Sequence, residues 1–216
     1  MTKGRTLMCT ASLGALVLGL AGGARAQGAS APSAADSIAG AIAAGRLLFD
    51  VRGRWEQVDK ARTTTVRDAA EAYTVRTRLG WETAPWNHVK ALLEFQDVSH
   101  LGPQDFAVSP PGASTPPLNG AAKARYPLVN DPDVARLNRL QFAWSPIKAF
   151  TATVGRQQVL IDDQRFVGDV GWRQNGQTFD AARAEFAVGG LSGTYVYVDR
   201  VNRVLGPASD WASDSH

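Results

Sequence analysis

Sulfur is almost absent from this chain. Its one cysteine, Cys9, and its two methionines, Met1 and Met8, all lie among the first ten residues. The remaining residues can form no disulfide bond, offer no thiolate nucleophile and supply no cysteine ligand to a metal. Such a composition suits an oxidising compartment, where exposed thiols and methionines are at risk.

Motifs for nucleotide binding and hydrolysis are missing as well. The chain holds no Walker loop, no G-x-G-x-x-G, no H-E-x-x-H and no G-x-S-x-G. Its three histidines are His88 in or beside a turn, His100 in a long connection and His216 at the chain end. Isolated histidines of this kind favour solvated side chains over metal ligands or catalytic bases. We therefore expect no enzymatic activity, no metal and no cofactor.

Residues 1–26 have the three parts of a secretory signal peptide. Lys3 and Arg5 form a basic start, residues 7–21 are mostly apolar, and Ala24-Arg25-Ala26 is an A-x-A cleavage site. The apolar run is short for a membrane-spanning helix. Cleavage before Gln27 would remove three of the 23 basic residues and none of the 20 acidic ones. The net charge is then zero, and nucleic-acid binding is not expected.

After residues 27–46, a small-residue segment that favours a tether or a short helix, the sequence alternates with a period of two. In residues 49–56, 73–82 and 89–96, none of the 13 residues on one face is charged, whereas 9 of the 13 on the other face are. This pattern predicts β-strands with one apolar and one charged face. Four noisier segments follow at 139–144, 150–154, 182–186 and 195–199, which makes seven strands. In the last of them, Val196 and Val198 are assigned to the apolar face.

The connections between these strands alternate between long and short. The connection over 98–134 is the longest and holds seven of the eleven prolines, whereas Gly189-Gly190 forms a tight hairpin. Trp55, Trp81 and Trp144 lie near strand ends, as in an interfacial aromatic girdle. Together these features predict an all-β protein, an antiparallel transmembrane β-barrel of the outer-membrane type. A soluble sandwich or lipocalin-like barrel also alternates, but gives no reason for connections sorted by length.

The charged face would line the lumen of such a barrel. Arginine forks match carboxylates and favour anionic solutes, but five acidic residues accompany the bases, so a salt-bridged ladder that holds strand register is the simpler role for most of them. The basic residues of this face are Arg52, Arg54, Arg76, Arg78, Lys90, Arg139 and Arg183, and the acidic residues are Asp50, Glu56, Glu82, Glu94 and Glu185.

The segment over residues 155–182 is denser in polar residues than a connection requires. It contains Gly155-Arg156-Gln157, Asp163-Gln164-Arg165-Phe166-Val167-Gly168, Trp172-Arg173-Gln174 and Gln177-Thr178-Phe179-Asp180. These runs resemble the alginate export family of bacterial outer-membrane barrels, and the resemblance extends from about Gly45 onward. It implies a monomeric barrel in the outer membrane of a Gram-negative cell, surrounded by lipid, that passes anionic polysaccharide or small anionic solutes. Arg156, Arg165 and Arg173 would then be lumen or constriction residues.

One feature departs from that family. Bacterial single-chain barrels have an even number of strands, whereas seven are predicted here, and family members are longer. We therefore expect residues 47–216 to be the N-terminal portion of a larger barrel. Two other functions remain open from the sequence: a secreted soluble β-barrel that binds a ligand, with Phe49, Val51, Trp55 and Leu79 inside, and an outer-membrane hydrolase.

Overall fold

The computed structural model describes residues 35–109, 116–165, 167–206 and 211–212. The predicted signal peptide lies outside the described residues. A short helix, α1 (Ile38–Ala43), begins at Ser37, whose side-chain oxygen accepts a hydrogen bond from the Gly40 amide at 3.0 Å. No helix in the described part of the chain is long and apolar enough to span a membrane.

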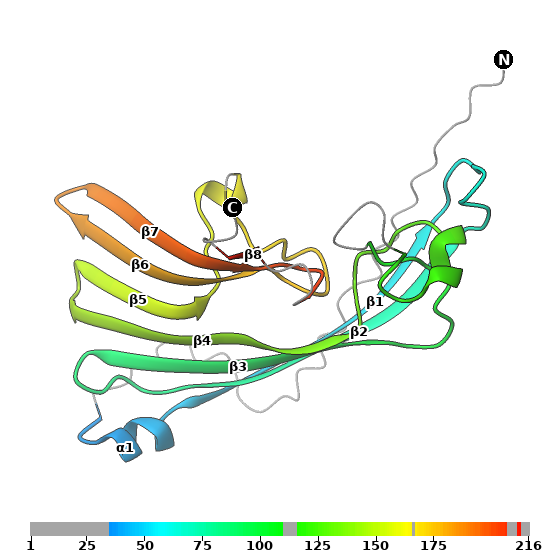
Figure 1. The fold of residues 1–216 in the computed structure, drawn as a ribbon. Coiled ribbons are helices and arrows are strands. Elements are labelled where there is room, and N and C mark those ends of the chain that lie inside the picture. The colour runs from blue at the N-terminus through cyan, green and yellow to red at the C-terminus, as the bar shows by residue number, and fades with distance from the viewer. Residues whose placement is uncertain (1–34, 110–115, 166, 207–210, 213–216) are drawn as a thin grey trace.

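The rest of the fold is one antiparallel sheet whose strands follow chain order (Figure 1). All seven predicted strands are present and most are longer than predicted, and the two-residue β8 follows them. The strands are β1 (Arg46–Val58), β2 (Ala70–Glu82), β3 (Val89–His100), β4 (Val134–Ile147), β5 (Phe150–Gln157), β6 (Thr178–Val188), β7 (Leu191–Asn202) and β8 (Trp211–Ala212). The predicted all-β antiparallel fold is confirmed.

The connections are sorted by length between the two ends of the sheet. The short ones, 83–88, 148–149 and 189–190, lie at one end, and the long ones, 59–69, 101–133 and 158–177, lie at the other. Two of the short connections contain a tight turn whose two central residues both have positive φ. These residues are Asn87 and His88, at 45° and 67°, and Gly189 and Gly190, at 58° and 85°. Positive φ at both positions matches the twist of tight hairpins. His88 is therefore a turn residue.

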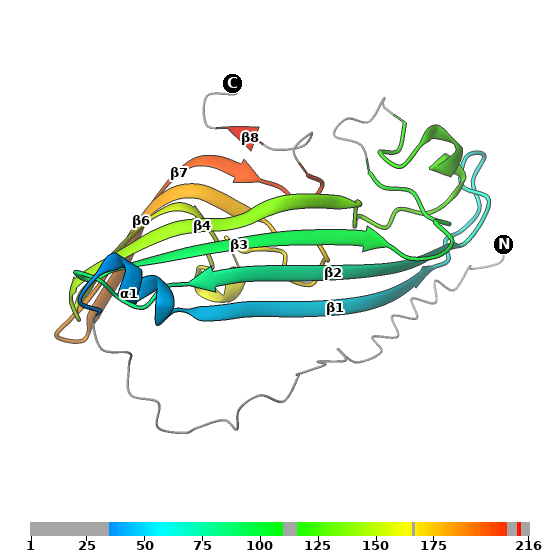
Figure 2. The same cartoon turned by 90° about the horizontal axis from the view of Figure 1, so that it is seen from below.

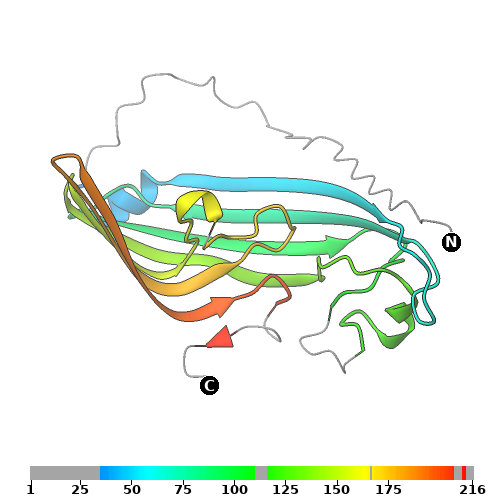
Figure 3. The same ribbon diagram turned by 90° about the horizontal axis from the view of Figure 1, so that it is seen from above.

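The sheet is curved, and its two faces differ in polarity. Figures 2 and 3 show the long strands from below and from above, with residues 158–165 and 167–177 of the β5–β6 connection on the concave side. On the concave face, Arg76, Glu94 and Gln96 are 6%, 4% and 2% exposed. The opposite, convex face exposes its apolar side chains, including Phe49 (58%), Leu79 (53%), Phe95 (54%) and Phe142 (49%). Exposure of Phe49 and Leu79 argues against the soluble barrel, which needs both inside.

The apolar face of β7 was assigned wrongly from the sequence. Tyr195 and Tyr197 pair with Ala184 and Ala182 on the convex face and are 67% and 56% exposed. Val196 and Val198 instead lie on the concave side, packed against the buried Val159, Phe179 and Ala181. The reason is physical: tyrosine suits an exposed apolar face with its ring, and the long connection over 158–177 brings an apolar cluster onto the concave face that the valines cover.

A second apolar cluster holds the β3–β4 connection on the concave side as well. Ala70 and Ala72 of β2 pack against Phe106, Val108 and Val129, and all five are at most 1% exposed. The described parts of this connection, residues 101–109 and 116–133, therefore pack on the concave face at the long-connection end of β2. This connection also includes η1 (Ala121–Arg125).

Gly155 of β5 is a position where only glycine fits. Its φ is 109°, and a Cβ atom there would lie 2.3 Å from the Leu140 carbonyl oxygen on β4. We expect Gly155→Ala to lower the free energy of unfolding by about 1–3 kcal/mol, because a side chain is strained in this conformation. Urea unfolding in detergent micelles measures the change.

Gly53 of β1 is the matched control for this substitution. A Cβ atom there would meet nothing within 4 Å, and its φ is not in the positive region. Gly53→Ala should leave the free energy of unfolding within about 0.5 kcal/mol of the original chain. Equal effects of the two alanines would contradict the strain assigned to Gly155.

Candidate functional site

Six residues of the β5–β6 connection, Gly171-Trp172-Arg173-Gln174-Asn175-Gly176, lie on the concave face of β1–β3. We call this stretch the inserted segment. It contains turns and bends but no helix or strand, so its position depends on contacts with its surroundings. We call the concave face of the sheet, together with the connection that packs on it, the wall. Gln174 and Asn175 are fully buried in these contacts.

The two buried amides bind backbone and side-chain groups of the wall. Gln174 Nε2 donates to Thr74 Oγ1 at 2.9 Å, to Thr74 O at 3.1 Å and to Arg52 O at 3.2 Å. Asn175 Nδ2 donates to Pro132 O at 2.9 Å, and its Oδ1 accepts from Gln96 Nε2 at 2.9 Å. The inserted segment is thereby joined to β1, β2, β3 and the β3–β4 connection.

Arginines of the wall satisfy four carbonyls of the inserted segment. Arg52 donates to Gly171 O at 2.9 Å and also to Arg173 O, and Arg54 donates to Trp172 O at 2.8 Å. Arg136 of β4 donates to Gly176 O. The contacts of Arg52 and Arg136 are partly buried and that of Arg54 is exposed, so these hydrogen bonds replace contacts with water and fix the backbone of the segment to the sheet.

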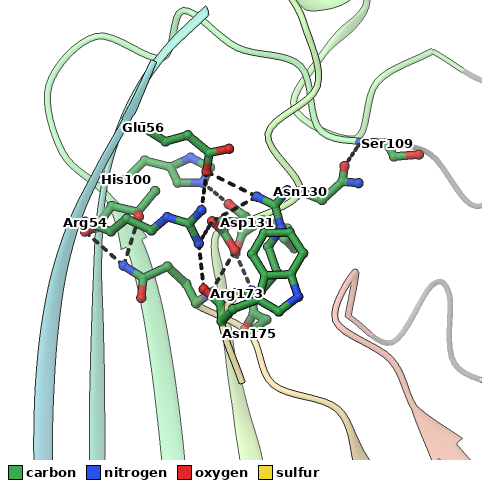
Figure 4. A network of polar contacts seen from close by, with 12 residues as sticks. Arg54, Glu56, His100, Ser109, Asn130, Asp131, Arg173 and Asn175 are labelled. Carbon is green, nitrogen blue, oxygen red and sulfur yellow. Dashed lines mark hydrogen bonds and ion pairs between the residues drawn. The ribbon is translucent and has the colours of Figure 1, made fainter. Parts of the chain in front are cut away.

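Asp131 lies at the centre of the polar network in Figure 4. It is fully buried, and its Oδ1 accepts a hydrogen bond from the backbone N–H of Gln174 at 2.8 Å. Its Oδ2 lies 3.5 Å from both Arg54 Nη1 and Arg173 Nη1. His100 Nε2 lies 2.6 Å from Asp131 O. One carboxylate therefore connects the β3–β4 connection, β1 and the inserted segment.

Glu56 is the second acid of this network. Its Oε2 accepts from Arg54 Nη2 at 2.6 Å and from Arg173 Nη1 at 3.3 Å. Beside these charges, the Trp172 ring is 62% exposed, with the Arg173 guanidinium 4.1 Å and that of Arg54 5.6 Å from its centroid. The site thus presents two arginines and an aromatic face.

Two ion pairs elsewhere on the concave face join neighbouring strands, as the predicted ladder requires: Arg139 pairs with Glu94 at 2.6 Å, and Arg76 pairs with Asp50. Arg183 pairs with Glu185 of its own strand at 3.4 Å. Arg78 differs, because its Nε donates to the neutral oxygen Gln96 Oε1 at 2.8 Å. Arg52 likewise donates only to carbonyl and amide oxygens. Among residues that bind the inserted segment or belong to it, four arginines, at positions 52, 54, 136 and 173, accompany three acids, at positions 56, 131 and 169.

Two of the predicted arginines stand apart from this group. Arg156 forms a bidentate pair with Asp180 at 2.7 and 2.9 Å. The register puts both residues on the face of Val154 and Ala182, the convex face, because side chains alternate along a strand. Arg165 follows η2 (Asp162–Gln164) and is exposed. Arg52, Arg54, Arg76, Arg78, Arg139, Arg173 and Arg183 are those brought to the concave side.

Sequence reasoning missed Asp131, Arg136, Gln174 and Asn175 as site residues. The polar density over 155–182 was a signal for the two amides. Asp131 and Arg136 gave none, because they belong to or follow a proline-rich connection whose path no periodicity predicts. No group of three or more histidine, cysteine, aspartate or glutamate side chains in the described ranges could hold a metal ion.

An antiparallel meander with apolar side chains outside, polar side chains inside and a connection folded onto the inner face is the wall of an outer-membrane type β-barrel. The comparison with protein families agrees with this class. The alginate export family model matches residues 46–197, and the chain belongs to that family, whose members are outer-membrane transport proteins. No curated protein and no solved structure matches the chain significantly.

Proposed function

We propose that the concave face and the inserted segment form the selective part of an outer-membrane channel for anionic polysaccharide or small anionic solutes, which pass by diffusion. The observation that carries the proposal is the set of arginines at the inserted segment, where four arginines accompany three acids and where Arg52 and the nearby Arg78 donate hydrogen bonds to neutral oxygens. A basic excess in a narrow, partly desolvated path lowers the electrostatic barrier for anions.

The convex face supports the placement in a membrane. Trp55 and Tyr73 stack at the long-connection end, with ring centroids 6.4 Å apart, whereas Trp81 lies toward the other end of β2. Tyr73 and Trp81 are eight residues apart on one strand, a separation of about 26 Å. The apolar band of outer-membrane barrels between its aromatic girdles is about 25 Å tall.

Channel selectivity tests the proposal. We expect the complete barrel to which these strands belong, reconstituted in planar bilayers, to prefer chloride over potassium in a salt gradient. The double variant Arg54→Gln, Arg173→Gln leaves Glu56 and Asp131 without cationic partners. It should lower the ratio of chloride to potassium permeability about threefold or more, a change of roughly 0.7 kcal/mol.

Arg156→Gln is the matched control, since Arg156 lies on the convex face and should not influence the path. Its reversal potential should equal that of the original chain. A complete barrel that carries no current, or a double variant with unchanged reversal potential, would refute the proposed selectivity.

A further inference from the structure

We propose that Arg52 is a positioning residue that holds the inserted segment against the wall and so sets the width of the path. This inference rests on the proposed channel function and assigns a role that the composition of the lining does not suggest. Arg52 would otherwise be taken as a cation that meets the solute.

The contacts of the Arg52 guanidinium all lead to the inserted segment. Nε donates to Gln174 Oε1 at 2.8 Å, Nη1 donates to Gly171 O at 2.9 Å, and Nη2 donates to Arg173 O. All three nitrogens of the planar fork are used, on acceptors that span four residues of one segment. A fork of fixed geometry can satisfy such a set, whereas a single ammonium group cannot.

Gln174 completes the contact from the other side. Its Nε2 donates back to Arg52 O at 3.2 Å and to Thr74 Oγ1 at 2.9 Å. Arg52 and Gln174 therefore bind one another through both side chains and a backbone oxygen, with Gln174 fully buried. We call this reciprocal pair the latch.

The inserted segment depends on the latch because it has no regular secondary structure of its own. Released from β1, the backbone of Gly171 and Arg173 would lose its donors from Arg52 and turn toward water. The segment would then keep its contacts with Arg54, Thr74, Gln96, Asp131, Pro132 and Arg136 but lie less firmly against the sheet at residues 171–174. The charge of Arg52 acts on the solute at a distance whether or not the segment is held, but its hydrogen bonds serve to position the segment.

Lysine at position 52 separates the two roles, since it keeps the charge and loses the fork. In the full chain, we expect Arg52→Lys to raise hydrogen exchange of the amides of residues 171–176 about tenfold, with the amides of β2 and β3 unchanged. Single-channel conductance should change about twofold, with more current fluctuation, while the reversal potential stays the same. The inference would be overturned if the Arg52→Lys variant had the same hydrogen-exchange rates at residues 171–176 and the same single-channel conductance as the original chain.

Arg76→Lys is the matched control. Arg76 lies on the neighbouring strand of the same face and its ion pair is with Asp50, outside the inserted segment. Exchange of residues 171–176 should be unaffected by this variant. An equal rise in both lysine variants would show a general loosening of the wall and would also overturn the inference.

Gln174→Ala provides an independent variant. If Arg52 acts through Gln174 and its neighbours, the double variant Arg52→Lys, Gln174→Ala should exchange little faster than the more affected single variant. Full additivity would contradict the latch. Absence of conductance in every protein would refute the proposed function alone, and the exchange measurement would still decide the role of Arg52.

Discussion

Replacing Asp131 with alanine is expected to lower the free energy of unfolding by about 3–5 kcal/mol, the usual effect of removing one partner from a buried ionic network. Asp131 Oδ2 lies 3.5 Å from both Arg54 Nη1 and Arg173 Nη1, and its Oδ1 accepts from the Gln174 amide. In the variant, Arg54 and Arg173 would share Glu56 as their acidic partner, and the buried backbone N–H of Gln174 would lose its acceptor. Urea unfolding in detergent micelles measures the loss.

Asp133→Ala is the control for this prediction. Asp133 carries the same side chain two positions along the same connection, and it is exposed. Its replacement should change the free energy of unfolding by no more than about 0.5 kcal/mol. If the two alanine variants unfold at the same urea concentration, Asp131 does not organise the network.

The strands were predictable because each depends on local alternation. Phe49, Val51 and Trp55 share one face of β1 with no charged residue between them on that face, so the period of two identifies both the strand and its orientation. Connection lengths then identify the two ends of the sheet. These signals lie within a few residues of one another, and tertiary contacts reinforce them.

The concave face was predictable in composition but not in pairing. Arg139 and Glu94 form a cross-strand pair, as a ladder requires. The partners of Arg52 and Arg54, in contrast, include backbone carbonyls more than 110 residues away. The path of a connection is fixed by buried amides and apolar clusters far along the chain, and no local period records it.

Arg156 and the valines of β7 show the limit of reasoning from residue type. Arg156 was expected in the lumen because the resemblance to the alginate export family implied it, but its register with Asp180 puts it on the convex face as a neutralised pair. Val196 and Val198 were expected on the convex face because they are apolar, but the cluster around Val159 gives them a buried site on the concave side. Pairing register, rather than polarity, determines the face of a strand residue.

Phe142→Arg tests which face meets hydrocarbon. Phe142 is 49% exposed on β4 and pairs with Ala91 and Val154 on the convex face. An arginine at this depth of a lipid-facing surface should lower the free energy of unfolding in lipid bilayers by about 2–4 kcal/mol. On a surface that meets water, the same change would cost almost nothing, because exposed arginine is fully hydrated.

Gln141→Arg is the control, one residue away on the concave face, where its partners in the sheet are Leu92 and Gly155. We expect it to change the free energy of unfolding by less than about 1 kcal/mol, since an arginine there meets a polar, hydrated lining. A large loss for Phe142→Arg with a small one for Gln141→Arg assigns the convex face to lipid. A small loss for Phe142→Arg with a large one for Gln141→Arg would place the charged face against lipid, where its ion pairs could not be hydrated. That result would refute the channel.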